Sequence, residues 1–220
     1  MSESGLSRLG AGAGALSVIA TFVGFGIHGG LPGSATAEAV RTYVDGVSAG
    51  QTGIGNYIEL LGYVLFLVFA SFLYAVTRAA NPDRLDWIPV LGLVAAAAYV
   101  AVSAVAVAEQ QTLVEWAKSG ADPKTVLGAL ILDDDTFTLS FELAAVFLTA
   151  TGVALFKAGR LLRLLGIGAI GIALIVFAAG MVGTASIESG IPQAGFLLFT
   201  LWTIVASVYL VIRPSLPTRV

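Results

Sequence analysis

The chain has 220 residues, of which 57% are hydrophobic and only 11% are charged, and its mean hydropathy is +0.93. Soluble domains carry about 25% charged residues, so this chain cannot bury its apolar surface in one soluble core and is predicted to be an integral membrane protein. A net charge of -3 argues against a nucleic-acid partner, which requires a basic face, and the absence of cysteine excludes disulfides and thiolate metal sites.

Six apolar runs are each long enough to cross the bilayer as a helix, because a hydrocarbon core of about 30 Å needs roughly 20 residues at about 1.5 Å each. The predicted spans cover residues 9–28, 54–76, 87–108, 137–156, 164–183 and 194–212. The sequence therefore predicts an all-α, six-helix transmembrane bundle that forms a single polytopic membrane domain over residues 1–220.

The first span carries small and polar residues at helical spacing, which should face neighbouring helices: Ser17, Thr21, Gly24 and His28. A cleaved signal peptide is the alternative interpretation, because the segment Ala35-Thr36-Ala37 resembles a cleavage site. The run is longer than the usual apolar region of a signal peptide, about 7 to 15 residues, which favours a retained span.

Two polar segments between spans are predicted to lie on the outer side and to contain short amphipathic helices. In the first segment, Ser34 is expected to cap a helix over residues 35–44. In the second, Asp122-Pro123 is typical of a helix N-terminus and predicts a short helix that ends at Leu130. Both helices are too short to span and are expected to lie flat over the mouth of the bundle.

Two further motifs suggest chemistry but are better explained by structure. The adjacent carboxylates of residues 133–135 would suit calcium or magnesium, yet the alternating ligands, the glycine and the distal glutamate of an EF-hand are missing. We interpret these acids as a solvated loop or the cap of the next helix. The G-x-G-x-x-G pattern of residues 166–171 lies inside an apolar run, so its glycines are interpreted as a helix-packing surface.

The basic residues predict the orientation of the bundle. With both termini in the cytoplasm, only Arg41, Lys118 and Lys124 of the eleven lysines and arginines lie outside. Lysine and arginine next to a span resist translocation, so this bias predicts cytoplasmic termini. The expected location is the plasma membrane of a prokaryote.

The basic connection from Lys157 to Arg163 leads through Leu164-Leu165 into a glycine-rich fifth span that begins near Gly166. With six spans and two outer segments that carry short helices, the chain resembles the uncharacterised bacterial membrane proteins grouped as "domain of unknown function 4386". It departs from that pattern where Leu161-Leu162 replaces a proline expected in the connection. The resemblance implies a topology and no activity.

Four ionisable residues, one on each of the first four spans, form the candidate polar pocket: His28, Glu59, Glu109 and Glu142. All four fall in the outer quarter of the membrane or at its interface and could converge in a pocket open to the outside. Imidazole and carboxylates suit zinc, iron or manganese, and carboxylates at this depth suit proton exchange. The chain has one histidine and no cysteine, which are few ligands for a catalytic zinc site. The four residues are therefore better interpreted as hydrogen-bonded packing residues. The sequence does not identify a metal or a cofactor for this pocket.

Two of these acids are expected to face the bundle rather than lipid, with at least one of them neutral. Glu59 is one helical turn from Tyr63, a hydrogen-bond donor. Glu142 shares the small, polar face of its span with Thr149 and Gly152, which is predicted to be the bundle interior.

The sequence leaves three functions open. A non-enzymatic binding, partner or stabilising protein is favoured, because no nucleophile–base pair and no metal motif is present in the sequence. A proton- or cation-coupled small transporter is the first alternative, and a membrane-embedded, metal-dependent hydrolase acting on lipid is the second. Membrane lipid is the expected partner, together with a second copy of the chain or another membrane protein.

Overall fold

The computed structural model describes residues 3–29, 36–46, 48–79, 87–156, 160–183 and 191–213. Every regular element in these ranges is an α-helix: α1 (Glu3–His28), α2 (Ala37–Gly46), α3 (Ala49–Ala79), α4 (Trp87–Lys118), α5 (Pro123–Phe156), α6 (Arg160–Gly183) and α7 (Ile191–Ile212). All of them except α2 are long and apolar enough to cross a membrane, which makes six candidate spans. The prediction of an all-α fold with six helices long and apolar enough to cross a membrane is confirmed for the described residues.

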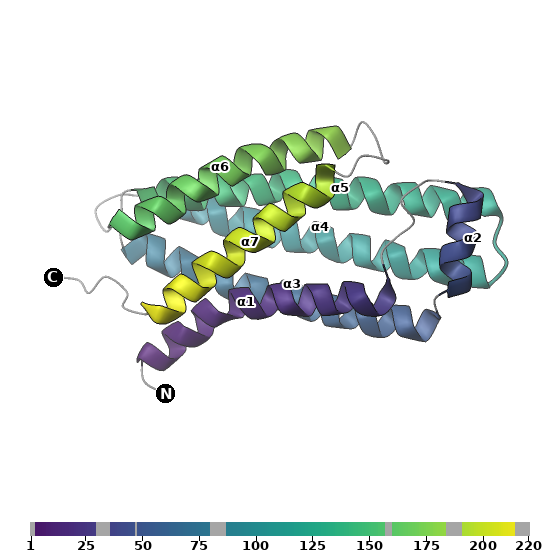
Figure 1. The fold of residues 1–220 in the computed structure, drawn as a ribbon, viewed down its shortest axis with the longest axis horizontal. Helices are drawn as coiled ribbons and strands as arrows, with labels where there is room; N and C mark the ends of the chain where they lie inside the picture. The colour runs from purple at the N-terminus through teal and green to yellow at the C-terminus, as the bar shows by residue number, and fades with distance from the viewer. Residues whose placement is uncertain are drawn as a thin grey trace.

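The long helices form a closed ring in the order α1, α3, α4, α5, α6, α7, in which each packs against its two neighbours. Figure 1 shows that both termini lie at one end of this bundle and that α2 lies across the other end. The interior of the ring is filled by aromatic side chains, among them Phe66, Phe147, Phe199 and Trp202. The bundle therefore has two distinct ends, and only one of them is covered by a helix.

Helices α4 and α5 are longer than the sequence predicts. With 32 and 34 residues, at about 1.5 Å per residue they extend well beyond a hydrocarbon core of about 30 Å. The predicted separate helix that ends at Leu130, lies flat over the bundle and is followed by a break before residue 137 is wrong, since residues 123–156 form one continuous helix. No proline or glycine interrupts residues 129–136, and Val126 and Leu130 pack against Leu113 of α4, so this polar stretch stays helical.

A tight turn joins these two helices. Gly120 has a φ of 80°, a left-handed conformation that glycine adopts without steric cost. The amide of Ala121 donates to Trp116 O at 3.0 Å, and that of Gly120 donates to Ala117 O at 3.3 Å, which together end α4 in a Schellman motif. Asp122 then caps α5 by accepting a hydrogen bond from the Lys124 amide at 2.8 Å.

Helix α2 packs on the tips of α4 and α5. Its Val40 is buried with Leu113 and Val114 of α4 and with Val126 of α5. The predicted cap, Ser34, lies outside the described residues, and Thr36 accepts the hydrogen bond from the Ala39 amide at 3.2 Å. Helix α2 thus packs on the projecting α4–α5 hairpin through a small apolar cluster that is separate from the main core of the bundle.

Glycines bring two pairs of helices into close contact. A Cβ on Gly24 of α1 would lie 2.7 Å from the Gly55 carbonyl oxygen of α3, and a Cβ on Gly152 of α5 would lie 2.7 Å from the Gly166 carbonyl oxygen of α6. Gly166 therefore packs as the sequence predicts. Gly171, in contrast, is exposed and has no atom of another helix within 4 Å of an added Cβ, so its assignment to a packing surface is wrong.

Helix α1 bends where Ser207 of α7 inserts its hydroxyl group. Ser207 Oγ accepts a hydrogen bond from the Ala15 amide at 3.0 Å and donates one to Ala11 O at 2.6 Å. Side chains that insert into the ladder of helical hydrogen bonds are a recognised cause of bends. Figure 1 shows α1 changing direction along its length.

Candidate functional site

A histidine and a glutamate meet inside the bundle, near the end that α2 covers. His28 ends α1 and Glu59 lies in α3, with His28 Nε2 and Glu59 Oε2 3.1 Å apart and both side chains 4% exposed. Tyr63, one turn along α3, donates a hydrogen bond to Glu59 Oε1 at 2.6 Å, so the expected donor is confirmed. A Cβ on Gly55 would lie 2.9 Å from His28 Cδ2, so the glycine makes room for the imidazole.

The other ring nitrogen of His28 is held from two sides. Nδ1 lies 2.6 Å from Gly29 O, and because a carbonyl oxygen only accepts hydrogen bonds, Nδ1 carries a hydrogen. Gln110 Nε2 of α4 lies 3.0 Å from Nδ1 and 3.4 Å from the hydroxyl of Tyr43 in α2. When the Gln110 amide group is rotated by half a turn, its oxygen takes the place of Nε2. The oxygen then accepts hydrogen bonds from both His28 Nδ1 and the Tyr43 hydroxyl.

This hydrogen-bond pattern determines how many protons the pair holds. Because Nδ1 is protonated, the contact between Nε2 and Glu59 Oε2 contains one further proton. That proton makes either an imidazolium beside a carboxylate or a neutral imidazole beside a carboxylic acid. The hydrogen bond from Tyr63 to Oε1 stabilises the carboxylate form, so the pair is best described as a buried ion pair.

Tyr43 connects this pair to α2. Burial is the largest effect on Tyr43 and raises its pKa. The nearby charge of Asp133 raises this pKa further. The phenol therefore stays protonated at neutral pH and acts as a donor to Gln110.

The remaining predicted site residues lie elsewhere on the bundle. Glu109 has one oxygen, Oε2, that is buried without a hydrogen-bond partner, and it interacts electrostatically with Asp133 of α5. Glu142 is partly exposed, and its Cγ lies 3.6 Å from where a Cβ on Gly180 of α6 would be. Within the described ranges, Glu142 forms no hydrogen bond or ion pair. The structure thus joins His28 to Glu59, leaves Glu109 only within electrostatic range of Asp133 and places Glu142 against α6.

The face of α5 that carries Glu142 differs from the predicted bundle interior. Gly152 is buried, but it packs on α6, and Thr149 is exposed. The larger residues Phe141 and Phe147 occupy the interior side of this helix instead. Small residues mark a close helix contact wherever it occurs, so they do not by themselves distinguish the centre of the ring from its perimeter.

Sequence reasoning missed three residues of this region. The sequence predicts that Gln110, Asp133 and Tyr43 lie in polar segments between spans, although Gln110 is 5% exposed and Asp133 is 4% exposed. The helical spacing that continues from Ser103 through Gln110 would have placed Gln110 on the inner face of α4, had the helix been extended beyond residue 108.

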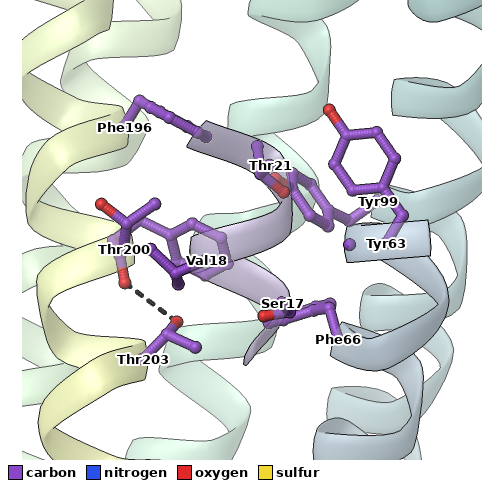
Figure 2. Close-up of a pocket in the computed structure, with 11 residues that line it drawn as sticks. Ser17, Val18, Thr21, Tyr63, Phe66, Tyr99, Phe196, Thr200 and Thr203 are labelled. Atoms are coloured by element: carbon purple, nitrogen blue, oxygen red, sulfur yellow. Dashed lines mark hydrogen bonds between the residues drawn. The ribbon is translucent and has the colours of Figure 1, made fainter. Parts of the chain in front are cut away.

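A small cavity, which Tyr63 lines, continues the polar region. Its volume of about 20 Å³ is enough for one water molecule, which needs roughly 10 to 15 Å³ by the same measure. Figure 2 shows the side chains of α1, α3, α4 and α7 around it, with hydroxyl groups supplied by Ser17, Thr21, Tyr63, Thr200 and Thr203. The stripe predicted on α1 is confirmed as inward-facing, since all four of its residues are buried.

Aromatic rings close the bundle beyond this cavity. The ring centroids of Phe66 and Phe147 are 5.3 Å apart, those of Phe66 and Phe199 are 5.5 Å apart, and those of Phe147 and Trp202 are 6.2 Å apart. Phe69 and Leu73, further toward the end that holds the termini, are at most 1% exposed. The polar side chains around His28 therefore end at an apolar barrier in the interior of the bundle.

The described residues include no group of three or more histidine, aspartate or glutamate side chains placed to hold a metal ion. No family model, curated protein or solved structure matches the chain. The resemblance to the family of unknown function therefore stays a prediction, and the conclusions about function depend on the geometry of the site.

Proposed function

We propose that the protein is a non-enzymatic, multi-pass membrane protein that binds a small ligand or a partner at the end of the bundle covered by α2. The observation that supports this proposal is the hydrogen-bonded connection from Tyr43 through Gln110 to the His28–Glu59 pair. Through it, a helix that does not span the bundle is linked to a buried ion pair between two helices that do. An event at α2 is thereby coupled to the packing of α1 against α3.

The aromatic barrier favours binding over transport. A carrier needs its ionisable residues to be reached in turn from both sides of the membrane. The cluster of Phe66, Phe147, Phe199 and Trp202 separates the polar side chains from the opposite end. The hydrolase has less support, because the described residues lack a clustered ligand set for its metal.

The proposed setting is the plasma membrane of a prokaryote, with both termini in the cytoplasm and α2 outside. The described end that holds the termini carries five arginines: Arg8, Arg78, Arg160, Arg163 and Arg213. Such an excess of basic residues is typical of the cytoplasmic side. The outward faces of the long helices expose many large apolar side chains, for which membrane lipid is the natural partner.

A proton-flux assay tests this function. The purified protein is reconstituted into liposomes that contain a pH-sensitive dye, and a pH gradient is applied with and without a sodium gradient. We expect the wild type, Glu59→Gln and protein-free liposomes to equilibrate at the same rate. Flux above the protein-free rate that Glu59→Gln abolishes would overturn the proposal and identify a proton-coupled transporter.

That transporter is the second candidate because of one observation. Tyr63 links Glu59 to the water-sized cavity, so hydroxyl groups extend the polar region toward the barrier. Rotation of the aromatic rings would be needed to complete a path. The same flux assay distinguishes the two candidates.

A further inference from the structure

The small cavity inside the bundle is built from buried polar side chains. It has a volume of about 20 Å³, and the residues that supply its hydroxyl groups are at most 6% exposed. Ser17 and Thr21 line it from α1, Thr200 and Thr203 from α7, and Tyr63 from α3 (Figure 2). Helices α1 and α7 therefore present hydroxyl groups to the same enclosed space.

Most of these hydroxyl groups can only accept a further hydrogen bond. A hydroxyl group has one hydrogen to donate and two lone pairs that accept. Four of them already donate that hydrogen to an oxygen of the chain: Ser17 to Gly14 O at 2.7 Å, Thr200 to Leu197 O at 3.0 Å, Thr203 to Phe199 O at 3.0 Å and Tyr63 to Glu59 Oε1 at 2.6 Å. What these four offer to the cavity is a set of acceptors.

The hydroxyl group of Thr21 differs from the others. Thr21 is 5% exposed, and its side chain forms no hydrogen bond within the described ranges. A Cβ on Gly62 of α3 would lie 2.6 Å from Thr21 Oγ1, so the glycine leaves the space that this oxygen occupies. Buried polar groups nearly always have a hydrogen-bond partner, and the cavity that Thr21 lines is the place where one can bind.

The size and the hydrogen-bonding pattern of the cavity fit water. A buried water molecule needs roughly 10 to 15 Å³ by this measure and two to four polar partners. It donates two hydrogens, which suits the acceptors, and it also accepts one, which suits Thr21. Among the described residues no carboxylate lines the cavity, and the carboxylate of Glu59 is bound to His28. A cation there would be a buried charge without compensation, which is costly.

We propose that this cavity binds one water molecule, which accepts a hydrogen bond from Thr21 and donates to hydroxyl oxygens of α1 and α7. Tyr63 lines the same cavity and donates to Glu59, so the water adjoins the His28–Glu59 pair. Thr203 is one helical turn from Ser207, whose hydroxyl group bonds to the backbone of α1. The polar connection that begins at α2 thereby extends to α7 and joins α1 to α7 beside the bend in α1.

A matched pair of threonine variants tests this site. Thr203→Val keeps the shape of the side chain and removes an acceptor from the cavity. Thr52→Val is the control, because Thr52 is 0% exposed and its hydroxyl donates to the carbonyl four residues earlier, Ser48 O, as that of Thr203 does, but it does not line the cavity. Both variants of the full-length protein are unfolded thermally in the same detergent.

We expect Thr203→Val to lower the thermal midpoint by about 2 to 4 °C more than Thr52→Val, because the water loses a partner in the first variant only. Equal losses for the two variants, or a smaller loss for Thr203→Val, would mean that no water depends on this hydroxyl group and would overturn the proposal.

Crystallography of the wild type gives a second measurement that does not require any variant to fold. In a map that resolves ordered water elsewhere on the protein, we expect a density peak within hydrogen-bond distance of Thr21 Oγ1 and of a hydroxyl oxygen of α7. The absence of this peak would overturn the proposal, and so would a peak whose oxygen neighbours all lie closer than hydrogen-bond distance, which would identify a cation. Neither measurement depends on the result of the flux assay, so the failure of this inference and of the proposed function are distinguishable.

Discussion

At the residue scale, the His28–Glu59 pair is sensitive to the loss of either partner. The two side chains are 4% exposed, and removing one member of a buried ion pair typically costs about 3 to 5 kcal/mol because the other is left unpaired. Gln110 and Tyr63 hold the remaining polar atoms of the pair. The surrounding hydrogen bonds therefore make this position specific for a charged pair, whereas a solitary acid would be expected to be neutral.

We predict that Glu59→Gln lowers the thermal midpoint strongly and that Glu142→Gln does not. The first substitution leaves His28 without its carboxylate, while the second alters a partly exposed side chain that makes no hydrogen bond within the described ranges. The change for Glu142→Gln should correspond to about 0.5 kcal/mol or less. Thermal unfolding of both variants in the same detergent measures the difference. Equal losses for the two variants would mean that the ion pair contributes no more than the isolated glutamate.

The loss of stability expected on replacing a buried serine also depends on its position. Ser207 and Ser103 are both 0% exposed, but Ser207 bridges Ala11 and Ala15 of α1. Ser103 Oγ lies near the hydroxyl groups of Tyr63 and Tyr99 but makes no hydrogen bond of 3.5 Å or less within the described ranges. We expect Ser207→Ala to destabilise the protein by about 1 kcal/mol or more and Ser103→Ala to be neutral or stabilising. Thermal unfolding of the two variants provides the comparison. A larger loss for Ser103→Ala would contradict the role assigned to the α1 bend.

At the element scale, the fit between α1 and α3 depends on glycine. A Cβ on Gly55 would lie 2.9 Å from both the Gly24 carbonyl oxygen and His28, so Gly55→Ala must push the helices apart. We predict a strong loss of stability for Gly55→Ala, together with weaker coupling of His28 to Glu59. Gly53→Ala on the same helix is the control, because its Cβ would make only an ordinary contact at 3.8 Å. Gly53 is partly exposed, and alanine there should gain up to about 1 kcal/mol of helix stability. Similar midpoints for the two variants would show that the contact between α1 and α3 can relax.

The elements themselves were predictable to different degrees. The six candidate spans follow from hydropathy alone, because apolar runs of this length are typical of transmembrane helices. The extensions of α4 and α5 were missed because residues 109–136 are polar enough to suggest a loop. Their helical structure depends on the packing of Leu113, Val114 and Leu130 with Val40 of α2. Contacts of this kind join segments that are distant in the sequence, so no local pattern reports them.

The candidate site was predictable to a similar extent. The stripe on α1 and the inward direction of Glu59 follow from helical spacing, and both agree with the structure. Glu142 is grouped with them by its depth and by the small, polar face of its span, and neither feature determines which neighbour a helix face meets. Asp133 could not be identified before α5 was known to be continuous, because a carboxylate in a loop would be solvated.

At the scale of the whole molecule, the two ends of the bundle differ in charge and in covering. One end holds both termini and the five described arginines, whereas the other holds α2, the α4–α5 turn and the buried acids. Because basic residues next to spans resist translocation, this difference favours one orientation in the membrane. In that orientation the His28 network faces the outside of the cell.

Cysteine labelling in intact cells tests this orientation, and the chain has no native cysteine to interfere. Ser119 lies exposed in the turn between α4 and α5, and Arg160 lies exposed at the start of α6, near the opposite end. We predict that a membrane-impermeant maleimide labels Ser119→Cys in intact cells and labels Arg160→Cys only after permeabilisation. Gly171→Cys, an exposed position in the middle of α6 that would face lipid, should stay unlabelled in both conditions and serves as the control. The reverse pattern would place α2 in the cytoplasm and contradict the proposed orientation.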